Sequence, residues 1–201
     1  MFGLAGAHRS GKSTLAKDIS KQTGIPYVNS SVTEQMKIAG YSGVQNLSLE
    51  ERIEAQELLL EFYLEKLDAA PKPYITDRTP LDMVAYTLGE LTMHNSSAEL
   101  GKRYDQYCVS CIQATKSYFS HIFITRPLET YEVDPTKPPQ NLGYQWMIQI
   151  MIEGSAAMLN AGTRVSTLLT SDHEVRVKSI LERLQADLNE LSQLKNSAPF
   201  N

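Results

Sequence analysis

Short apolar runs alternate with longer segments of helical periodicity along this chain of 201 residues. The runs are rich in β-branched and aromatic residues and are bounded by turn residues, which is typical of buried strands. Five runs are expected to form strands: Phe2–Ala5, Tyr27–Asn29, Tyr74–Thr76, Ile122–Thr125 and Val165–Leu169. Because a helical segment separates each run from the next, the pattern predicts an α/β fold, with helices on both faces of a parallel sheet.

Two helical segments contain polar residues at informative positions. From Leu49 to Leu67, apolar residues recur in steps of three and four, which predicts an amphipathic helix. Gln56 falls within the apolar stripe, so its amide either reads the edge of a bound base or satisfies a carbonyl group in the core. The last helix is expected to begin with a capping box in which Ser171 caps the first turn and Glu174 reaches back.

One segment interrupts the alternation of strands and helices. Residues 126–142 contain four prolines and show no sustained period. A loop of this length commonly serves as a lid, and it leaves the carboxyl end of a predicted strand, where open α/β sheets bind ligands. We therefore expect a lid over about 127–142. Arg126, at its start, either reaches a transferring phosphate or forms an ion pair with Glu129 or Asp134.

Length and charge narrow the classes of function. With 42% hydrophobic residues, the chain is expected to form one domain over residues 1–201. The net charge of −4 leaves no basic field for DNA or RNA, so nucleic acid is not an expected partner. Without a signal region or a long apolar stretch, we expect a cytoplasmic protein with no membrane partner. The oligomeric state is left open, with a homodimer as one option.

The strongest local signal lies directly after the first predicted strand. The nine residues from Gly6 read Gly-Ala-His-Arg-Ser-Gly-Lys-Ser-Thr, which matches G-x-x-x-x-G-K-[ST] between a strand and a helix. Gly6 and Gly11 let consecutive backbone N–H groups surround phosphate oxygens. Lys12 then reaches the β- and γ-phosphates, the Ser13 hydroxyl ligates Mg²⁺, and Thr14 completes the motif. ATP and Mg²⁺ are therefore the predicted cofactors.

A second polar cluster follows the third predicted strand. Asp77 and Arg78 come directly after Tyr74–Thr76, so they reach the same edge of the sheet as the phosphate loop. The Asp77 carboxylate can hold the Mg²⁺ shell or accept a proton from an attacking hydroxyl, and the planar fork of Arg78 suits a phosphate. The alternative is that Asp77 caps the next helix and Arg78 forms a surface ion pair.

The phosphate loop, the Asp77-Arg78 pair and the Ala85-Tyr86 dipeptide together resemble the nucleoside and nucleoside-monophosphate kinases. Thymidylate kinases and phage deoxynucleoside-monophosphate kinases are included, and ribosylnicotinamide kinase domains are also similar. The resemblance implies a three-layer P-loop kinase fold with a five-stranded parallel sheet of order 2-3-1-4-5 and a short lid. It also implies that Lys12 and Ser13 handle ATP and Mg²⁺.

The same resemblance implies further roles in catalysis. Asp77 would organise the metal or the attacking oxygen, and Arg78 would grip the acceptor phosphate. In one class of thymidylate kinases a loop arginine supplies the charge that other members place in the lid. The lid of this chain has only Lys137 as a cation, so Arg9 is the matching catalytic candidate, because phosphoryl transfer needs the migrating charge neutralised. The other interpretation is an Arg9 that faces solvent.

The sequence indicates the acceptor less clearly than it indicates ATP. His8 stands where those thymidylate kinases usually carry an aspartate that contacts the acceptor sugar, which speaks against specificity for thymidylate and makes a broader deoxynucleotide acceptor, or a nucleoside, more plausible. His8 can still hydrogen-bond a sugar. Tyr86 either stacks on the base or packs in the core. Glu34 either binds a sugar hydroxyl or caps a helix, and capping is favoured.

These residues favour an enzyme that moves the γ-phosphoryl group of ATP to a (deoxy)nucleoside monophosphate. A nucleoside or ribosylnicotinamide kinase, in which Asp77 acts on a 5′-hydroxyl, is the second hypothesis. The third is a regulatory P-loop ATPase without a small acceptor, for which the apolar segment 144–158 would present a partner surface. We expect Trp146, Met147, Ile150 and Met151 of this segment to pack on the sheet instead.

Overall fold

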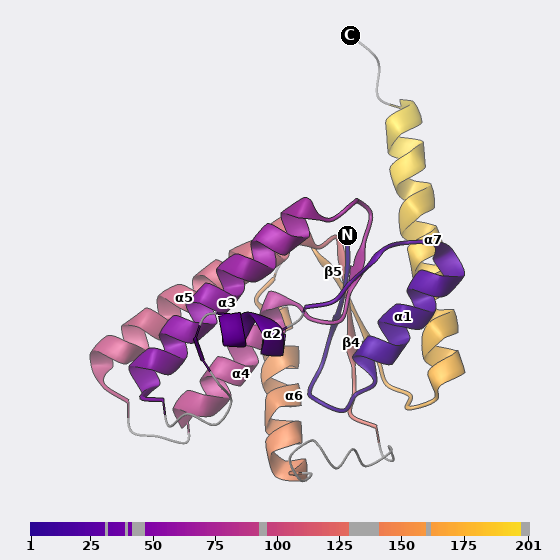
Figure 1. Cartoon of the computed structure of the whole chain (residues 1–201). Helices are drawn as coiled ribbons and strands as arrows, with labels where there is room; N and C mark the ends of the chain where they lie inside the picture. Colours follow the sequence, from indigo (N-terminus) through magenta and orange to yellow (C-terminus); the bar gives the residue numbers. More distant parts are fainter. Residues whose placement is uncertain are drawn as a thin grey trace.

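Five strands form the centre of the protein, as seen in a computed structural model (Figure 1). The structure describes residues 1–30, 32–38, 40–41, 47–92, 96–128, 141–159 and 162–197. The strands are β1 (Phe2–Ala5), β2 (Tyr27–Val28), β3 (Ile75–Thr76), β4 (His121–Thr125) and β5 (Arg164–Leu168). The helices are α1 (Lys12–Thr23), α2 (Val32–Ile38), α3 (Leu49–Ala69), α4 (Pro80–Thr92), α5 (Ala98–Tyr118), α6 (Leu142–Ala157) and α7 (His173–Ser197).

All strand pairs are parallel, and the order β2-β3-β1-β4-β5 confirms the predicted sheet. β1 lies at the centre, where Phe2 is in register with Ile75 of β3 and with His121 of β4. The bounds of the other four strands differ from those predicted by one residue at one or both ends. The central position of β1 places the loop that follows it between the ends of β3 and β4.

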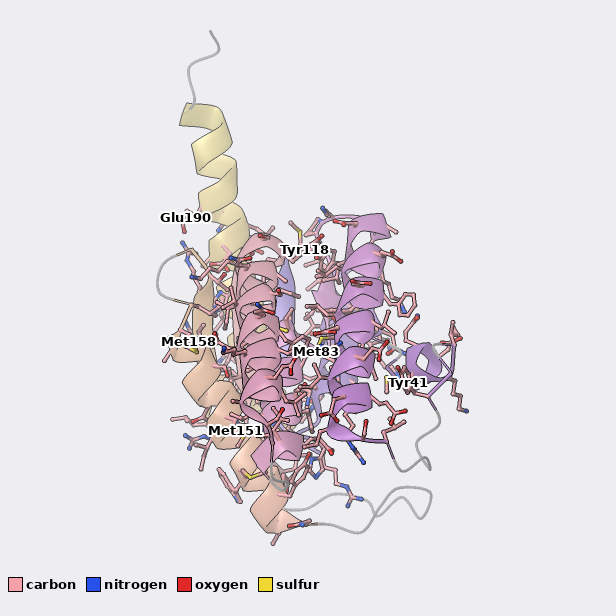
Figure 2. All side chains as sticks on the ribbon, turned by 90° about the vertical axis from the view of Figure 1, so that its left-hand side faces the viewer. Tyr41, Met83, Tyr118, Met151, Met158 and Glu190 are labelled. Carbon is pink, nitrogen blue, oxygen red and sulfur yellow. The ribbon has the colours of Figure 1, made fainter. Side chains whose placement is uncertain are left out.

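Helices cover both faces of the sheet, which gives three layers (Figure 1). Alternate residues of a strand point to opposite faces, so Phe2 and Leu4 pack with α1 and α7, whereas Ala5 packs with the opposite layer. That second layer consists of α3, α4, α5 and α6, and Met83 of α4 lies fully buried within it (Figure 2). In the part of the chain that the structure describes, no helix is long and apolar enough to cross a membrane.

The exposed side of α6 corrects one prediction. Met147 and Met151 pack against the core as expected, but Trp146 is 46% and Ile150 is 65% exposed. Figure 2 shows Met158, directly after α6, which is also exposed. Gln145, Gln149 and Glu153 recur at steps of four along α6, yet Gln145 and Gln149 are fully buried, so the polarity of the sequence did not indicate which face is buried.

The start of α7 corrects a second prediction. The helix begins at His173, and the Asp172 carboxylate accepts a hydrogen bond from the backbone N–H of Val175 at 2.9 Å. The capping residue is therefore Asp172, and the predicted box of Ser171 and Glu174 is wrong by one residue. The Asp172 N–H donates to the Thr170 hydroxyl at 3.1 Å, and this turn delays the first helical residue.

Gly3 provides a test of the packing at the centre of the sheet. A Cβ atom at Gly3 would lie 2.6 Å from the Thr79 methyl group and 2.9 Å from the Phe119 ring. Gly3→Ala is expected to destabilise the protein by about 1–3 kcal/mol, because a filled core must shift to admit the methyl group. Thermal unfolding followed by circular dichroism measures the effect.

The matched control is Gly101→Ala in α5, where nothing lies within 4 Å of an added Cβ. This change is expected to raise the thermal midpoint slightly, because alanine favours a helix over glycine by up to about 1 kcal/mol. A Gly3→Ala protein that unfolds at the wild-type temperature would show that this contact is not tight.

Candidate functional site

The phosphate loop joins β1 to α1 in a shape that requires glycine at two positions. Gly6 has φ 151°, and a Cβ there would lie 2.3 Å from the Thr125 carbonyl oxygen at the end of β4. Gly11 has φ 81° and lies directly before α1. Arg9 also adopts a left-handed φ of 60° between them. The loop is thus tightly curved and packed against the end of a neighbouring strand.

Lys12 folds its side chain over this loop. Its ammonium group donates to the carbonyl oxygen of Ala7 at 2.8 Å and also to that of Gly6. Burial lowers the pKa of Lys12 to about 8, and the nearby Asp82 carboxylate opposes the shift. The cation therefore lies at the concave side of the loop, in a setting where its charge responds to mildly alkaline pH.

Ser13 and Asp77 meet at the start of α1. The Ser13 hydroxyl donates to Oδ2 of the Asp77 carboxylate, which also accepts from the Tyr27 hydroxyl at 2.7 Å. Burial and Asp77 raise the pKa of Tyr27, so this phenol stays protonated as a donor. The partners of Asp77 lie on α1, on β2 and at Ser30, so its carboxylate does not serve as the cap of α4.

A hydroxyl beside a carboxylate is a donor set that suits Mg²⁺. Within the described residues no cluster of three or more His, Cys, Asp or Glu side chains could hold a metal. Ser13 and Asp77 offer two oxygen ligands, and Mg²⁺ commonly takes its other ligands from phosphates and water.

Asp82 is a site residue that the sequence analysis missed. Its side chain is 1% exposed and accepts from the backbone N–H of Gly6 at 3.1 Å. It also accepts from the backbone N–H and the hydroxyl of Thr79, both at 2.8 Å. One carboxylate thus ties the phosphate loop to the start of α4. The sequence did contain a pattern that could have indicated this role, because Thr79 and Asp82 have the spacing of a capping box.

Two glutamines of α6 were also missed. Gln149 accepts from the Ala7 N–H at 3.0 Å, and the Gln145 amide donates to the His8 carbonyl at 2.6 Å. Both side chains are fully buried and lie four residues apart on one face of the helix. Two glutamines at this spacing in an apolar run need buried partners, and here the partner is the phosphate loop.

Three of the predicted acceptor residues come together beside the loop. The Tyr86 hydroxyl lies 3.5 Å from Nδ1 of His8, and the Arg78 guanidinium carbon lies 5.5 Å from the centre of the Tyr86 ring. Tyr144 of α6 adds a fourth side chain, with its ring centre 5.9 Å from that of His8. Burial, Lys12 and Arg9 lower the pKa of His8, so it is neutral at pH 7.

The two remaining arginine candidates flank the start of the lid. The Arg9 carbonyl accepts from the Leu128 N–H at 3.3 Å, which connects the phosphate loop to the segment after β4. Arg126 pairs with Glu153 of α6 at 3.3 Å, a partner that the sequence analysis did not anticipate. The lid residues 129–140, with Glu129, Asp134 and Lys137, lie outside the described residues.

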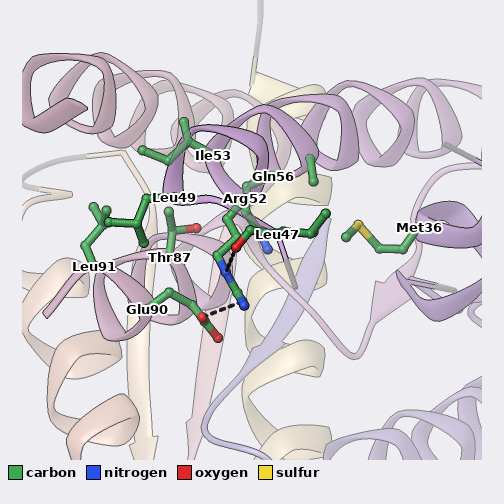
Figure 3. A pocket seen from close by; sticks show the side chains of 10 residues that line it. Met36, Leu47, Leu49, Arg52, Ile53, Gln56, Thr87, Glu90 and Leu91 are labelled. Carbon is green, nitrogen blue, oxygen red and sulfur yellow. Dashed lines mark hydrogen bonds and ion pairs between the residues drawn. The ribbon is translucent and has the colours of Figure 1, made fainter. Parts of the chain in front are cut away.

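A pocket opens between α2, α3 and α4 (Figure 3). Its empty volume is about 450 Å³, which includes the open space at its mouth. Gln56 lines it beside the ion pair that joins Arg52 to Glu90 at 2.7 Å. Thr87 of the lining and Tyr86 are consecutive residues of α4, so this helix contributes both to the pocket and to the cluster of His8, Arg78, Tyr86 and Tyr144. Its lining residues are Met36, Leu47, Leu49, Arg52, Ile53, Ala55, Gln56, Thr87, Glu90 and Leu91.

Glu34 is not part of this lining. It is exposed in the first turn of α2, where a carboxylate is favoured by the helix dipole.

Comparison with known proteins agrees with this architecture. Residues 2–167 match a family model described as an AAA domain. No curated protein sequence matches the chain. The similar solved structures share low identity with the chain, so they show its fold alone, a P-loop kinase-like fold. The predicted resemblance and fold class are thereby confirmed.

Three of these solved structures are nucleotide-binding proteins or kinases that share the fold of this chain. Deoxyadenosine kinase from M. mycoides, with products dCMP and a flexible dCDP bound, is 15% identical with a TM-score of 0.63 over 92% of this chain and 98% of that chain. Thymidylate kinase from Candida albicans is 15% identical, with a TM-score of 0.57 over 94% and 92%. The YorR protein from Bacillus subtilis, in complex with phosphorylated GDP, is 16% identical, with a TM-score of 0.53 over 94% and 97%.

Proposed function

The chain belongs to the AAA domain family, and we propose that it transfers the γ-phosphoryl group of ATP to a (deoxy)nucleoside monophosphate, giving the diphosphate. One observation carries the proposal. The Asp77 carboxylate meets Ser13 of the phosphate loop, while the next residue, Arg78, lies against Tyr86. A group that can hold the metal and a cation that can hold a second phosphate thus come from the end of one strand.

On the ATP side, the backbone of the loop from Gly6 to Gly11 holds the phosphates, and Lys12 and the end of α1 add positive charge. Thr14 stands in the first turn of α1 beside Ser13. When bound by Ser13 and Asp77, Mg²⁺ would neutralise charge on the phosphates. Arg9 and Arg126 are the proposed cations for the transferred group, because they lie on the two segments joined by the Arg9–Leu128 hydrogen bond.

On the acceptor side, Arg78 holds the phosphate and His8 contacts the sugar. Tyr86 stacks on the base or orients His8, and Gln56 reads the base edge from the pocket between α2, α3 and α4. Glu34 is a further candidate for the sugar hydroxyl. The Arg52–Glu90 pair gives the pocket a donor and an acceptor that apolar walls surround.

The test is a panel of acceptors. The purified chain is incubated with Mg²⁺ and ATP and with each common nucleoside, ribosylnicotinamide and each monophosphate, and ADP formation is followed by a coupled assay. Turnover with one or more monophosphates, with the diphosphate identified by chromatography, is the expected result. If no acceptor exceeds the rate with water, the kinase proposal fails, and a regulatory ATPase becomes the better hypothesis.

A nucleoside kinase is the second candidate. It is supported by the likeness to a deoxyadenosine kinase and by the Asp77 carboxylate, which could accept the proton of a 5′-hydroxyl. Exclusive turnover of nucleosides in the panel would favour it.

Arg78→Ala distinguishes the two candidates. For a monophosphate acceptor, the KM of the acceptor is expected to rise roughly ten- to hundredfold with a smaller change in kcat, because a charge-assisted hydrogen bond to phosphate is lost. For a nucleoside acceptor, the change should fall mainly on kcat. Steady-state kinetics with the best acceptor measure both constants.

The control is Arg103→Ala, which removes an arginine that pairs with Glu57 on the surface of α3. It should leave both constants near their wild-type values. An Arg78→Ala enzyme with unchanged kcat and KM would remove Arg78 from the acceptor site.

A further inference from the structure

Arg176 is a buried arginine in the first turn of α7, and its side chain is 2% exposed. Its guanidinium group donates from Nη1 to the Ser10 carbonyl oxygen at 2.7 Å and from Nη2 to the Arg126 carbonyl oxygen at 2.9 Å. Nε donates to the Thr170 carbonyl oxygen at 2.6 Å. All three directions of the planar fork are therefore used, and each reaches the backbone of a different segment.

The three segments are the phosphate loop, the start of the lid after β4, and the connection from β5 to α7. All of them leave the carboxyl edge of the parallel sheet, where such folds bind ligands. Helices α1 and α7 lie side by side on the same face of the sheet (Figure 1), and the hydrogen bond to Ser10 joins the start of α7 to the phosphate loop that leads into α1. A Cβ at Gly11 would lie 3.9 Å from Nη1 and 3.5 Å from Leu128, so the loop rests directly on this support.

The hydrogen bond to Ser10 has a consequence for phosphate binding. In a trans peptide the C=O of one residue and the N–H of the next point in opposite directions. Because the Ser10 carbonyl points to Arg176, the Gly11 N–H points away from it. Phosphate loops bind their anion through such N–H groups, and they act well only when their orientation is set in advance.

We propose that Arg176 is a positioning residue for phosphoryl transfer, which orients the Ser10–Gly11 peptide and holds the phosphate loop in a fixed place relative to Arg126. This inference rests on the proposed kinase function. Burial lowers the pKa of Arg176 from its ordinary value, but an arginine stays protonated in proteins, so its charge also favours an anion in the loop. Its hydrogen bonds to neutral carbonyl groups leave that charge to act on the site.

Arg176→Lys and Arg176→Gln test the proposal. Lysine keeps the charge but presents one ammonium group, which cannot span three carbonyl groups, and glutamine removes the charge as well. Arg183→Met on the exposed side of α7 is the matched control. Thermal midpoints are measured first, and the dissociation constant of Mg²⁺-ATP, kcat and the acceptor KM are then measured well below each midpoint.

The expected result is a fall in kcat of at least roughly tenfold for Arg176→Lys, with the acceptor KM within about threefold of wild type, because only the ATP phosphates are misplaced. Arg176→Gln should also bind Mg²⁺-ATP roughly tenfold more weakly. Arg183→Met should match the wild type in every constant. A purely structural residue would lower the midpoint and leave kcat of the folded enzyme unchanged.

Wild-type kcat and ATP affinity in Arg176→Lys would overturn the proposal. Failure of both the lysine and glutamine variants to fold, shown by far-ultraviolet circular dichroism, would also overturn it in favour of a structural role. If the wild type phosphorylates no acceptor, the proposed function fails, and the ATP affinity of Arg176→Gln against Arg183→Met then decides separately whether Arg176 orients the loop.

Discussion

Replacing Asp82 with asparagine is expected to lower the thermal midpoint by on the order of 10 °C and to weaken ATP binding severely. The Asp82 carboxylate accepts three hydrogen bonds, from Gly6 and twice from Thr79, in a fully buried position. Asparagine has the same size but only one acceptor oxygen, so one or two buried donors lose their partner. Each such loss costs about 1–3 kcal/mol.

The same change also acts on Lys12. Asp82 is the nearby charge that most raises the pKa of Lys12 against the effect of burial. Without it, the pKa falls below its present value of about 8, and a larger fraction of Lys12 is neutral at pH 7.5. Both the shape of the phosphate loop and its cation are therefore affected by one substitution.

Thermal unfolding and ATP titration at pH 6.5 and 7.5 measure these effects. Asp105→Asn, on the exposed side of α5, is the control and should change neither quantity. If Asp82→Asn unfolded and bound ATP as the wild type does, the link from Asp82 to Gly6 and Lys12 would not contribute to the site.

Lys12→Met is expected to lower kcat/KM on the order of a thousandfold, because it removes a cation aimed at charge that develops in the transition state. Methionine is unbranched like lysine and only one atom shorter, so it fills most of the same space without the charge. Steady-state kinetics with the acceptor identified in the panel measure the loss. Lys17→Met on the exposed side of α1 removes the same charge outside the loop and should have wild-type kinetics.

The pH dependence of ATP affinity tests whether Lys12 carries the charge that binds the phosphates. The pKa of Lys12 is lowered to about 8, so the unliganded enzyme loses this charge as the pH rises through 8. The affinity for ATP should therefore decline between pH 7 and 9.5 in the wild type and should vary much less in Lys12→Met. Bound phosphates raise the pKa of a nearby lysine, so kcat should decline at a higher pH than ATP affinity. An equal decline in the Lys12→Met protein would assign the titration to another group.

Features that are formed by residues close together in the sequence could be predicted well. The phosphate loop is contiguous, and the strand before it and the helix after it can be recognised from their periods. The fold class followed from the alternation of strands and helices, and the strand order from the family resemblance. The structure also places Ser13 next to Asp77, and His8, Arg78 and Tyr86 beside one another, although their roles stay predictions.

Two sequence-based predictions were wrong, one for the buried face of α6 and one for the cap of α7. In α6 the polar side chains of Gln145 and Gln149 are buried against the phosphate loop, while the apolar Trp146 and Ile150 face solvent, which is the reverse of what polarity predicts. Ser171 was predicted to cap α7, but the turn in which the Asp172 N–H bonds to Thr170 leaves Asp172 as the cap. Tertiary packing decided the first case, and a local turn of the backbone decided the second.

By itself the sequence determined that this protein has a P-loop on a parallel sheet, because that motif needs only the residues next to it and the periods around it. The contacts that hold this loop in place became visible only in the folded protein. Asp82, Gln149 and Arg176 bind its backbone from sequence distances of 76, 142 and 166 residues. Hydrogen bonds between such distant segments follow from how helices dock on the sheet, and no local pattern specifies them.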